Sequence, residues 1–160
     1  DTYIPNSVDI VDDIRFLRRF KDGSVDILYV SAVLEHFGRW EKDAILKRWH
    51  VLLKPGTGIL RLSVPSFDAI VDHYLEHKDL RILHGMILGG QDYSTNFHKM
   101  IWNEKTLQED LLAAGFKVTR LWDWKTTLPH DQIDDFSRSY LPHMDFDNGK
   151  LMHVNMEAIA

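Results

Sequence analysis

Apolar residues occur along the chain in short runs, with two kinds of spacing. Short runs rich in apolar and β-branched residues at 8–11, 26–30 and 58–64 predict strands. Apolar side chains three and four positions apart predict a helix over 40–53, and Ser66 is predicted to cap the start of a second helix. The first half of the chain therefore indicates strands that alternate with helices.

The second half of the chain is less regular. Its pattern predicts an irregular insertion with a short helix, a capped helix, a strand, a long polar loop and a final strand, at 80–102, 103–115, 117–124, 125–148 and 150–160. No helix is predicted between the last two strands, so we expect them to be antiparallel.

This order of elements predicts the fold class. Strands that alternate with helices form parallel crossover units, with helices on the faces of the sheet. We therefore expect an α/β protein, a Rossmann-like three-layer sandwich with a mixed sheet and an antiparallel C-terminal strand. A chain of 160 residues fits a single domain over 1–160. We place Trp40 and Trp49 in its core, and Trp122 and Trp124 on one face of a strand.

Composition narrows the class of protein. A net charge of -5 argues against broad nucleic-acid binding, and the short basic stretch 15–21 is interpreted as a solvated face. There is no cysteine, which suits a reducing compartment, so we expect a cytoplasmic protein. No apolar run approaches the roughly 20 residues of a membrane span. We expect a small-molecule partner, with neither nucleic acid nor membrane.

Three places carry candidate chemistry. In open α/β sheets, ligands bind beyond the carboxyl ends of the strands, which here are followed by 12–14, 31–36 and 65–67. A carboxylate at the first place can accept hydrogen bonds from a ribose hydroxyl or an adenine amino group, and Ile14 can cover the ring. The alternative is that the two aspartates at 12 and 13 only cap a loop.

The motifs together resemble those of a known family. The string DGSVDILYVSAVLEHF at 22–37, a helix, and LLKPGTGILRLSVP at 52–65 are similar to the class I S-adenosylmethionine-dependent methyltransferases. More narrowly they resemble the small bacterial type-11-like members, often associated with sugar or cell-surface biosynthesis. NFHKMIW at 96–102 and TLQEDLLAAGFKV at 106–118 resemble the later loop, helix and turn of that family.

The resemblance implies a cofactor site and an activity. Asp1 falls at the position that would bind the ribose hydroxyls, Asp13 and Ile14 at the pair that would bind adenine, and Ser31 and Ala32 at residues that would line the cofactor. The implied activity is methyl transfer from S-adenosylmethionine to a small hydroxyl- or amine-bearing acceptor, a sugar among the candidates.

One departure from the family matters. No GxGxG loop occurs in the sequence, and the chain begins where the second strand of the family ends. We therefore expect an N-terminally truncated chain that binds the cofactor weakly, with a degenerate binding or structural protein as the alternative. The strand expected at the sheet centre is absent, which would leave unpaired backbone groups. Direct pairing of its neighbours, loosening of 1–20 or a second chain would close the gap, so we expect a homodimer.

Three residues are candidate catalytic bases. Glu35, His36 and His98 could take a proton from the acceptor as it attacks the methyl group. For each an alternative stays open: a helix-start acid for Glu35, hydrogen bonding at a helix start or in a loop for His36, and pocket lining or burial for His98. In-line methyl transfer also profits mainly from positioning, so a base is optional.

Two further segments have alternative interpretations. The sequence HYLEH at 73–77 fits the H-x-x-E-H pattern of zinc peptidases, but no third ligand follows, and we expect no metal site there or elsewhere. The segment 130–145 is unusual for the fold and is expected either to shape an acceptor pocket or to cover the sheet edge.

Overall fold

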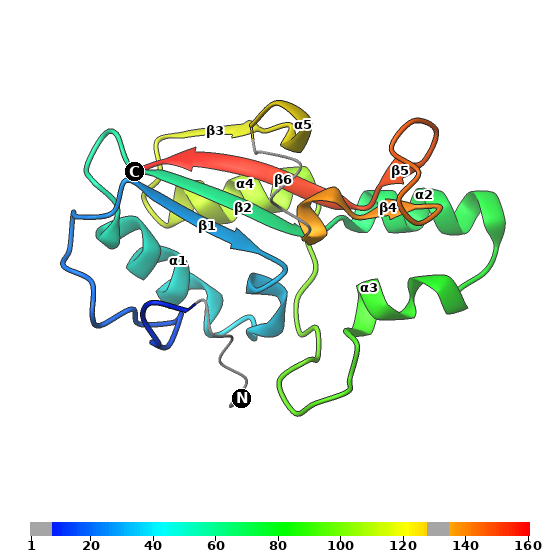
Figure 1. The fold of residues 1–160 in the computed structure, drawn as a ribbon, viewed down its shortest axis with the longest axis horizontal. Helices are drawn as coiled ribbons and strands as arrows, with labels where there is room; N and C mark the ends of the chain where they lie inside the picture. The colour runs from blue at the N-terminus through cyan, green and yellow to red at the C-terminus, as the bar shows by residue number, and fades with distance from the viewer. Residues whose placement is uncertain (1–7, 128–134) are drawn as a thin grey trace.

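The computed structural model describes residues 8–127 and 135–160, and its centre is a four-stranded mixed sheet (Figure 1). The strand order is β1-β2-β6-β3, with β1 and β2 parallel and β6 antiparallel to both β2 and β3. The strands are β1 (Ile27–Ser31), β2 (Ile59–Pro65), β3 (Val118–Leu121) and β6 (His153–Ile159). The predicted mixed α/β sheet and its antiparallel C-terminal strand are confirmed.

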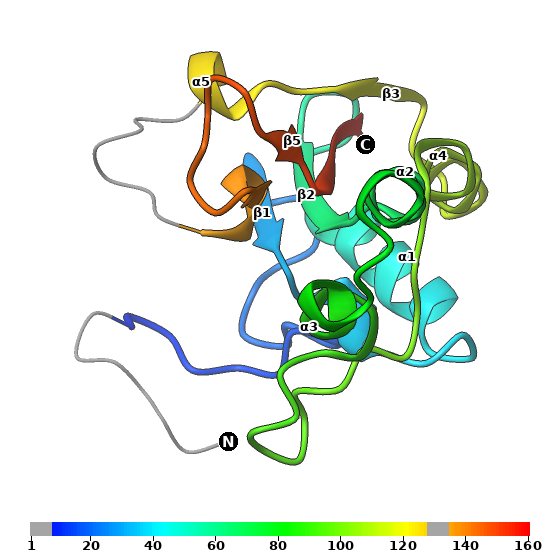
Figure 2. The same cartoon turned by 90° about the vertical axis from the view of Figure 1, so that its right-hand side faces the viewer.

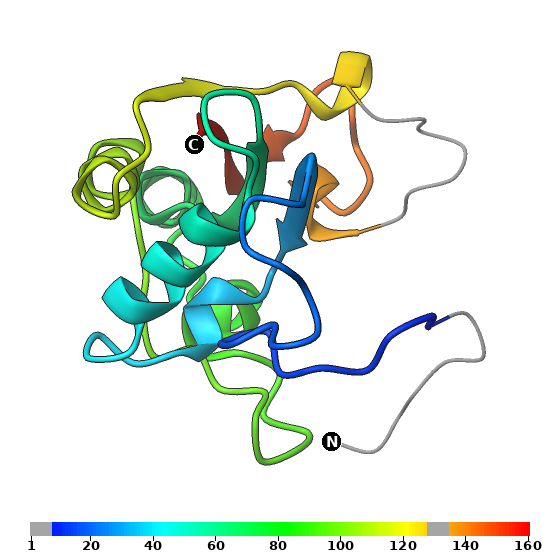
Figure 3. The same cartoon turned by 90° about the vertical axis from the view of Figure 1, so that its left-hand side faces the viewer.

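Helices lie mainly on one face of this sheet (Figures 2 and 3). The longer helices are α1 (Lys42–Leu52), α2 (Phe67–His77) and α4 (Glu104–Ala113), and the short helices are α3 (His84–Leu88) and α5 (Trp124–Thr127). Single 3-10 turns are η1 (Leu34–His36), η2 (Arg81–Leu83) and η3 (Phe136–Arg138), and a separate small hairpin pairs β4 (Tyr140–Leu141) with β5 (Lys150–Leu151). η3 packs against β2 and β6 on the face opposite to α1 and α4.

The predicted caps and core explain where the helices lie. The Ser66 side chain accepts a hydrogen bond from the backbone of Ala69, and Asn103 forms a capping box with Thr106, so each satisfies backbone groups at a helix start.

The main core lies between the sheet and the helices α1 and α4, around the fully buried Trp49. The indole Nε1 of Trp49 donates to the backbone oxygen of Ile14 (2.8 Å) and so ties the 8–20 segment to α1.

Two predictions in the first third of the chain are wrong. Residues 8–11 form no strand, and their apolar side chains are about half exposed. A strand needs a partner for its backbone groups, and among the described residues β1 has a neighbour only on the β2 side. Trp40 is 84% exposed rather than buried, because α1 begins only at Lys42 and Trp40 precedes it, beside Arg39.

The predicted boundaries also change in the last third. The strand predicted over 117–124 ends at Leu121, so the alternation argument for Trp122 and Trp124 was wrong, although both indoles are buried. The predicted loop over 125–148 contains the end of α5, η3 and β4 among its described residues. The final strand is interrupted at Met152, between β5 and β6. No helix in the described ranges is long and apolar enough to cross a membrane.

Candidate active site

The carboxyl ends of β1 and β2 and the start of β6 border a cavity of about 530 Å³. The three candidate bases meet here, since a single ligand atom from each of Glu35, His36 and His98 lies within 4.8 Å of the other two. The lining also includes Ala32, Phe136 and His153. This is the position that the rule for open α/β sheets assigns to a ligand.

A second cavity of about 540 Å³ lies beside the first. It brings together Asp13, Ile14 and Ala32, three of the predicted cofactor contacts. Both cavities share Ala32, His36 and Tyr93 in their linings, so they meet along a common wall. The cofactor and acceptor positions implied by the resemblance can therefore be adjacent.

The other two predicted cofactor contacts are not brought to these cavities. Ser31 lines neither of them, and its hydroxyl donates to the carboxylate of Asp135 (3.2 Å). Asp1 lies outside the described residues.

Backbone conformation marks the junction of the two cavities. Ala32 follows β1 with φ of 52°, in the left-handed region that a residue with a Cβ rarely adopts. Its N–H is held by the backbone oxygen of Ser63 on β2 (3.0 Å). The sheet thus fixes a strained residue at the common wall, as is frequent at functional sites.

The two neighbouring aspartates after residue 11 have different surroundings. Asp12 accepts backbone hydrogen bonds from Arg19 and Asp13 (both 2.8 Å), which is the loop-capping role. The Arg15 guanidinium donates to both carboxylate oxygens of Asp13 at 2.7 to 3.1 Å, and this pairing lowers the pKa of Asp13. Asp13 therefore lines the second cavity as a carboxylate that is already paired with the Arg15 guanidinium.

Glu35 is the most strongly perturbed acid at the site. It is fully buried in η1, and burial raises its pKa to about 8. Within the described part of the chain, neither of its carboxylate oxygens has a hydrogen-bond partner. The neighbouring His98 Nε2 lies 3.9 Å from Oε1 of Glu35, but burial lowers the pKa of His98, so this imidazole is neutral at pH 7.

The loop that carries His98 is held in place by its backbone. The backbone N–H groups of Lys99 and Met100 donate to the carbonyl oxygen of Glu35 (2.7 and 3.2 Å). Gly89 precedes this loop with φ of 81°, and a Cβ there would lie 2.5 Å from the backbone oxygen of Asn96. Only glycine allows the backbone at position 89 to come this close to the backbone of Asn96. This close contact leads the chain from α3 back to η1 and places His98 opposite Glu35.

Sequence reasoning missed one further group at the site, His153, and one residue beside it, Asp135. Asp135 accepts hydrogen bonds from the hydroxyl of Tyr29 (2.6 Å) and from Ser31, so the segment before η3 is bonded to the edge strand β1. His153 lines the 530 Å³ cavity, shares a hydrogen bond with Ser63 (2.9 Å), and has its pKa lowered to about 3 by burial. Both residues are remote in sequence from the motifs, and their polar character in segments interpreted as loop or strand was the only signal.

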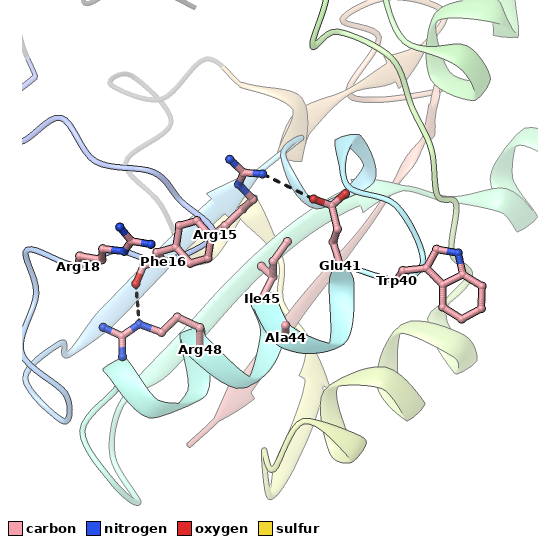
Figure 4. A pocket seen from close by; sticks show the side chains of 8 residues that line it. All are labelled: Arg15, Phe16, Arg18, Trp40, Glu41, Ala44, Ile45 and Arg48. Carbon is pink, nitrogen blue, oxygen red and sulfur yellow. Dashed lines mark hydrogen bonds and ion pairs between the residues drawn. The ribbon is translucent and has the colours of Figure 1, made fainter.

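A third cavity, of about 500 Å³, lies along α1 (Figure 4). Arg15 approaches Glu41 there (3.7 Å), and Arg48 donates to the backbone oxygen of Phe16 (2.6 Å). The basic stretch at 15–21 therefore helps to hold the segment before β1 against α1. Among the residues that the structure describes, no histidine lines this cavity, so we do not assign the chemistry to it.

Similar folds occur among solved methyltransferase structures. A SAM-dependent methyltransferase from Methanosarcina mazei is 20% identical, with 94% of this chain and 66% of that one covered and a TM-score of 0.54. Another, from Thermotoga maritima, is 15% identical, with 92% and 61% covered and a TM-score of 0.52. An O-methyltransferase family protein from Burkholderia thailandensis is 14% identical, with 94% and 34% covered and a TM-score of 0.54.

These similarities define the fold of the chain. It is the class I fold of S-adenosylmethionine-dependent methyltransferases, Rossmann-like and with a mixed sheet. The chain spans 66%, 61% and 34% of the length of these three solved structures, respectively. No protein-family model matches the chain, and no curated protein matches it in sequence.

Proposed function

We propose that this chain takes part in methyl transfer from S-adenosylmethionine to a small hydroxyl- or amine-bearing acceptor, with sugars among the candidates. The observation that supports the proposal is the pair of adjoining cavities at the carboxyl end of β1, which meet at Ala32, His36 and Tyr93. Methyl transfer needs two molecules held end to end, and two cavities with a common wall suit that requirement.

Each cavity has a role in this proposal. The cavity with Asp13 and Ile14 takes the adenosine part of the cofactor, with Ile14 against the ring and the Asp13 carboxylate facing polar groups. The cavity with His36 and His98 takes the acceptor. A neutral imidazole there can accept the proton that the acceptor loses as its oxygen or nitrogen bonds to the methyl carbon.

One observation favours a rival function. The Asp13 carboxylate is already paired with Arg15, so a ligand at this place must compete with or share that contact. This pairing favours a methyltransferase-like binding or structural protein without cofactor affinity. The two functions differ in one measurable property, the affinity for the cofactor.

Isothermal titration with S-adenosylhomocysteine separates them. The methyl-transfer proposal expects saturable binding by this chain. It also expects that Tyr93→Ala, which changes an exposed ring at the common wall, lowers the affinity five- to tenfold. Tyr74→Ala removes a similarly exposed ring on α2, outside both cavities, and should leave the affinity unchanged. Absence of heat and of saturation in the unmodified chain would refute the methyl-transfer proposal.

A homodimer and a cytoplasmic location remain predictions. Among the described residues β1 is an edge strand, and an unpaired edge offers backbone groups to a second chain. Sedimentation equilibrium should then give twice the 18.7 kDa of one chain. A mass of a single chain at micromolar concentration would contradict the dimer.

A further inference from the structure

Glu35, His36 and His98 form a compact cluster of metal-ligating side chains. One potential ligand atom from each lies within 4.8 Å of the others, and the imidazole centroids of the two histidines are 4.8 Å apart. Ligand atoms around a tetrahedral ion lie about 3.4 Å apart when each bond is about 2.1 Å. Closing the cluster onto an ion therefore needs movements of about an ångström, within the reach of side-chain rotation.

Hydrogen bonds fix the same tautomer in both histidines. The Nδ1 atom of His36 lies 3.2 Å from the backbone oxygen of Phe97, and Nδ1 of His98 lies 2.9 Å from that of Met86. A carbonyl oxygen only accepts, so each Nδ1 carries the proton and each Nε2 keeps its lone pair. Metal-binding histidines have this arrangement, in which a carbonyl oxygen orients the ring and the other nitrogen is left for the ion.

The buried carboxylate supplies a second, independent observation. Glu35 is fully buried, lines the 530 Å³ cavity, and has neither oxygen bonded to a described group. An unpartnered buried carboxyl costs folding free energy, and a bound cation would offset that cost. A divalent ion between the three side chains would supply that charge.

We propose that Glu35, His36 and His98 bind one divalent cation of the zinc class at the wall of the 530 Å³ cavity. Two imidazole nitrogens and one carboxylate oxygen suit zinc or a similar transition metal better than magnesium, which prefers oxygen ligands. Three protein ligands leave a coordination position open, as in catalytic zinc sites. That position faces the cavity, where an oxygen atom of a small molecule can take it.

The cation narrows the class of acceptor, and this step rests on the proposed methyl transfer. An acceptor with a hydroxyl oxygen can bind the ion directly, which lowers the pKa of that hydroxyl and positions it beside the cofactor cavity. An amine that is protonated at neutral pH cannot. The site therefore favours a hydroxyl-bearing acceptor. The binding of the cation itself does not depend on the proposed methyl transfer.

The test uses the untagged chain, freed of metal with EDTA and titrated with ZnCl2 in a calorimeter. We expect one zinc ion per chain and a weakening of at least about tenfold in each of Glu35→Gln, His36→Ala and His98→Ala. His77→Ala is the matched control, because His77 is exposed on α2 and stacks only on His73. Its affinity should equal that of the unmodified chain.

Other outcomes would overturn the proposal. No binding, preference for MgCl2 over ZnCl2, or equal zinc affinity in the unmodified chain and Glu35→Gln would each do so. Glu35→Gln keeps the size of the side chain, so it remains informative if a histidine variant does not fold. Titration with S-adenosylhomocysteine in EDTA is run separately. Zinc binding without cofactor binding would leave the cation site standing and refute methyl transfer.

Discussion

Replacing Glu35 by glutamine should stabilise the metal-free protein at neutral and higher pH. Burial raises the pKa of this carboxyl from 4.5 to about 8. The folded state then holds the proton more tightly than the unfolded state, so this stability is fully present below pH 4.5 and is lost as the pH rises to 8. At about 1.36 kcal/mol per pKa unit, the loss is about 3 kcal/mol at pH 7 and about 4 kcal/mol at pH 8. Glutamine does not titrate, so the Glu35→Gln variant does not lose this stability as the pH rises.

Urea unfolding followed by tryptophan fluorescence, in EDTA at several pH values from 5 to 8, measures this effect. His98 also faces Glu35, and its lowered pKa gives the opposite slope, a loss of stability as the pH falls below about 6.5. His98 and His36 are present in both proteins, so the difference between them isolates Glu35. Glu76→Gln, on the exposed side of α2, is the control. A difference in unfolding free energy that stays constant from pH 5 to pH 8 would refute the reasoning.

Three further substitutions test the fold around the site, each by urea unfolding. Asn103→Ala removes the capping box of α4 and should cost about 1 kcal/mol; no change would show that the cap is dispensable. Ala32→Gly relieves a left-handed residue and should raise stability by about 1 kcal/mol, whereas a loss would contradict the strain. Trp49→Phe loses the bond to Ile14 and some packing, and should cost about 1–3 kcal/mol; an unchanged midpoint would show that this tie is unimportant.

Local signals predicted much of the fold. Ser66 and Asn103 were recognised as helix caps because the side-chain oxygen that satisfies a helix start belongs to the residue itself. The runs that became β1 and β2 are mostly apolar and bounded by turn residues. The run at 8–11 is also mostly apolar but forms no strand, because a strand depends on a neighbour that composition does not show.

The candidate site was predictable only in part, for a similar reason. Glu35 and His36 follow a strand directly, so the strand rule places them at the cavity. That His98 meets them depends on the close approach at Gly89 and on backbone bonds between Glu35 and the 97–100 loop. The contact of Asp135 with Tyr29 joins residues 106 apart, and no local pattern encodes such a pairing.

The position of β6 in the middle of the sheet also affects how the protein is made. β6 is the last strand of the described sheet in sequence, yet it pairs with β2 on one side and β3 on the other. During synthesis β1 and β2 can pair early, but β3 has no partner until residues 153–159 leave the ribosome. Completion of the described sheet therefore waits for β6, which joins β3 to the β1–β2 pair, and until then the β2 edge and the β3 segment that pair with β6 are exposed to other chains in the cell.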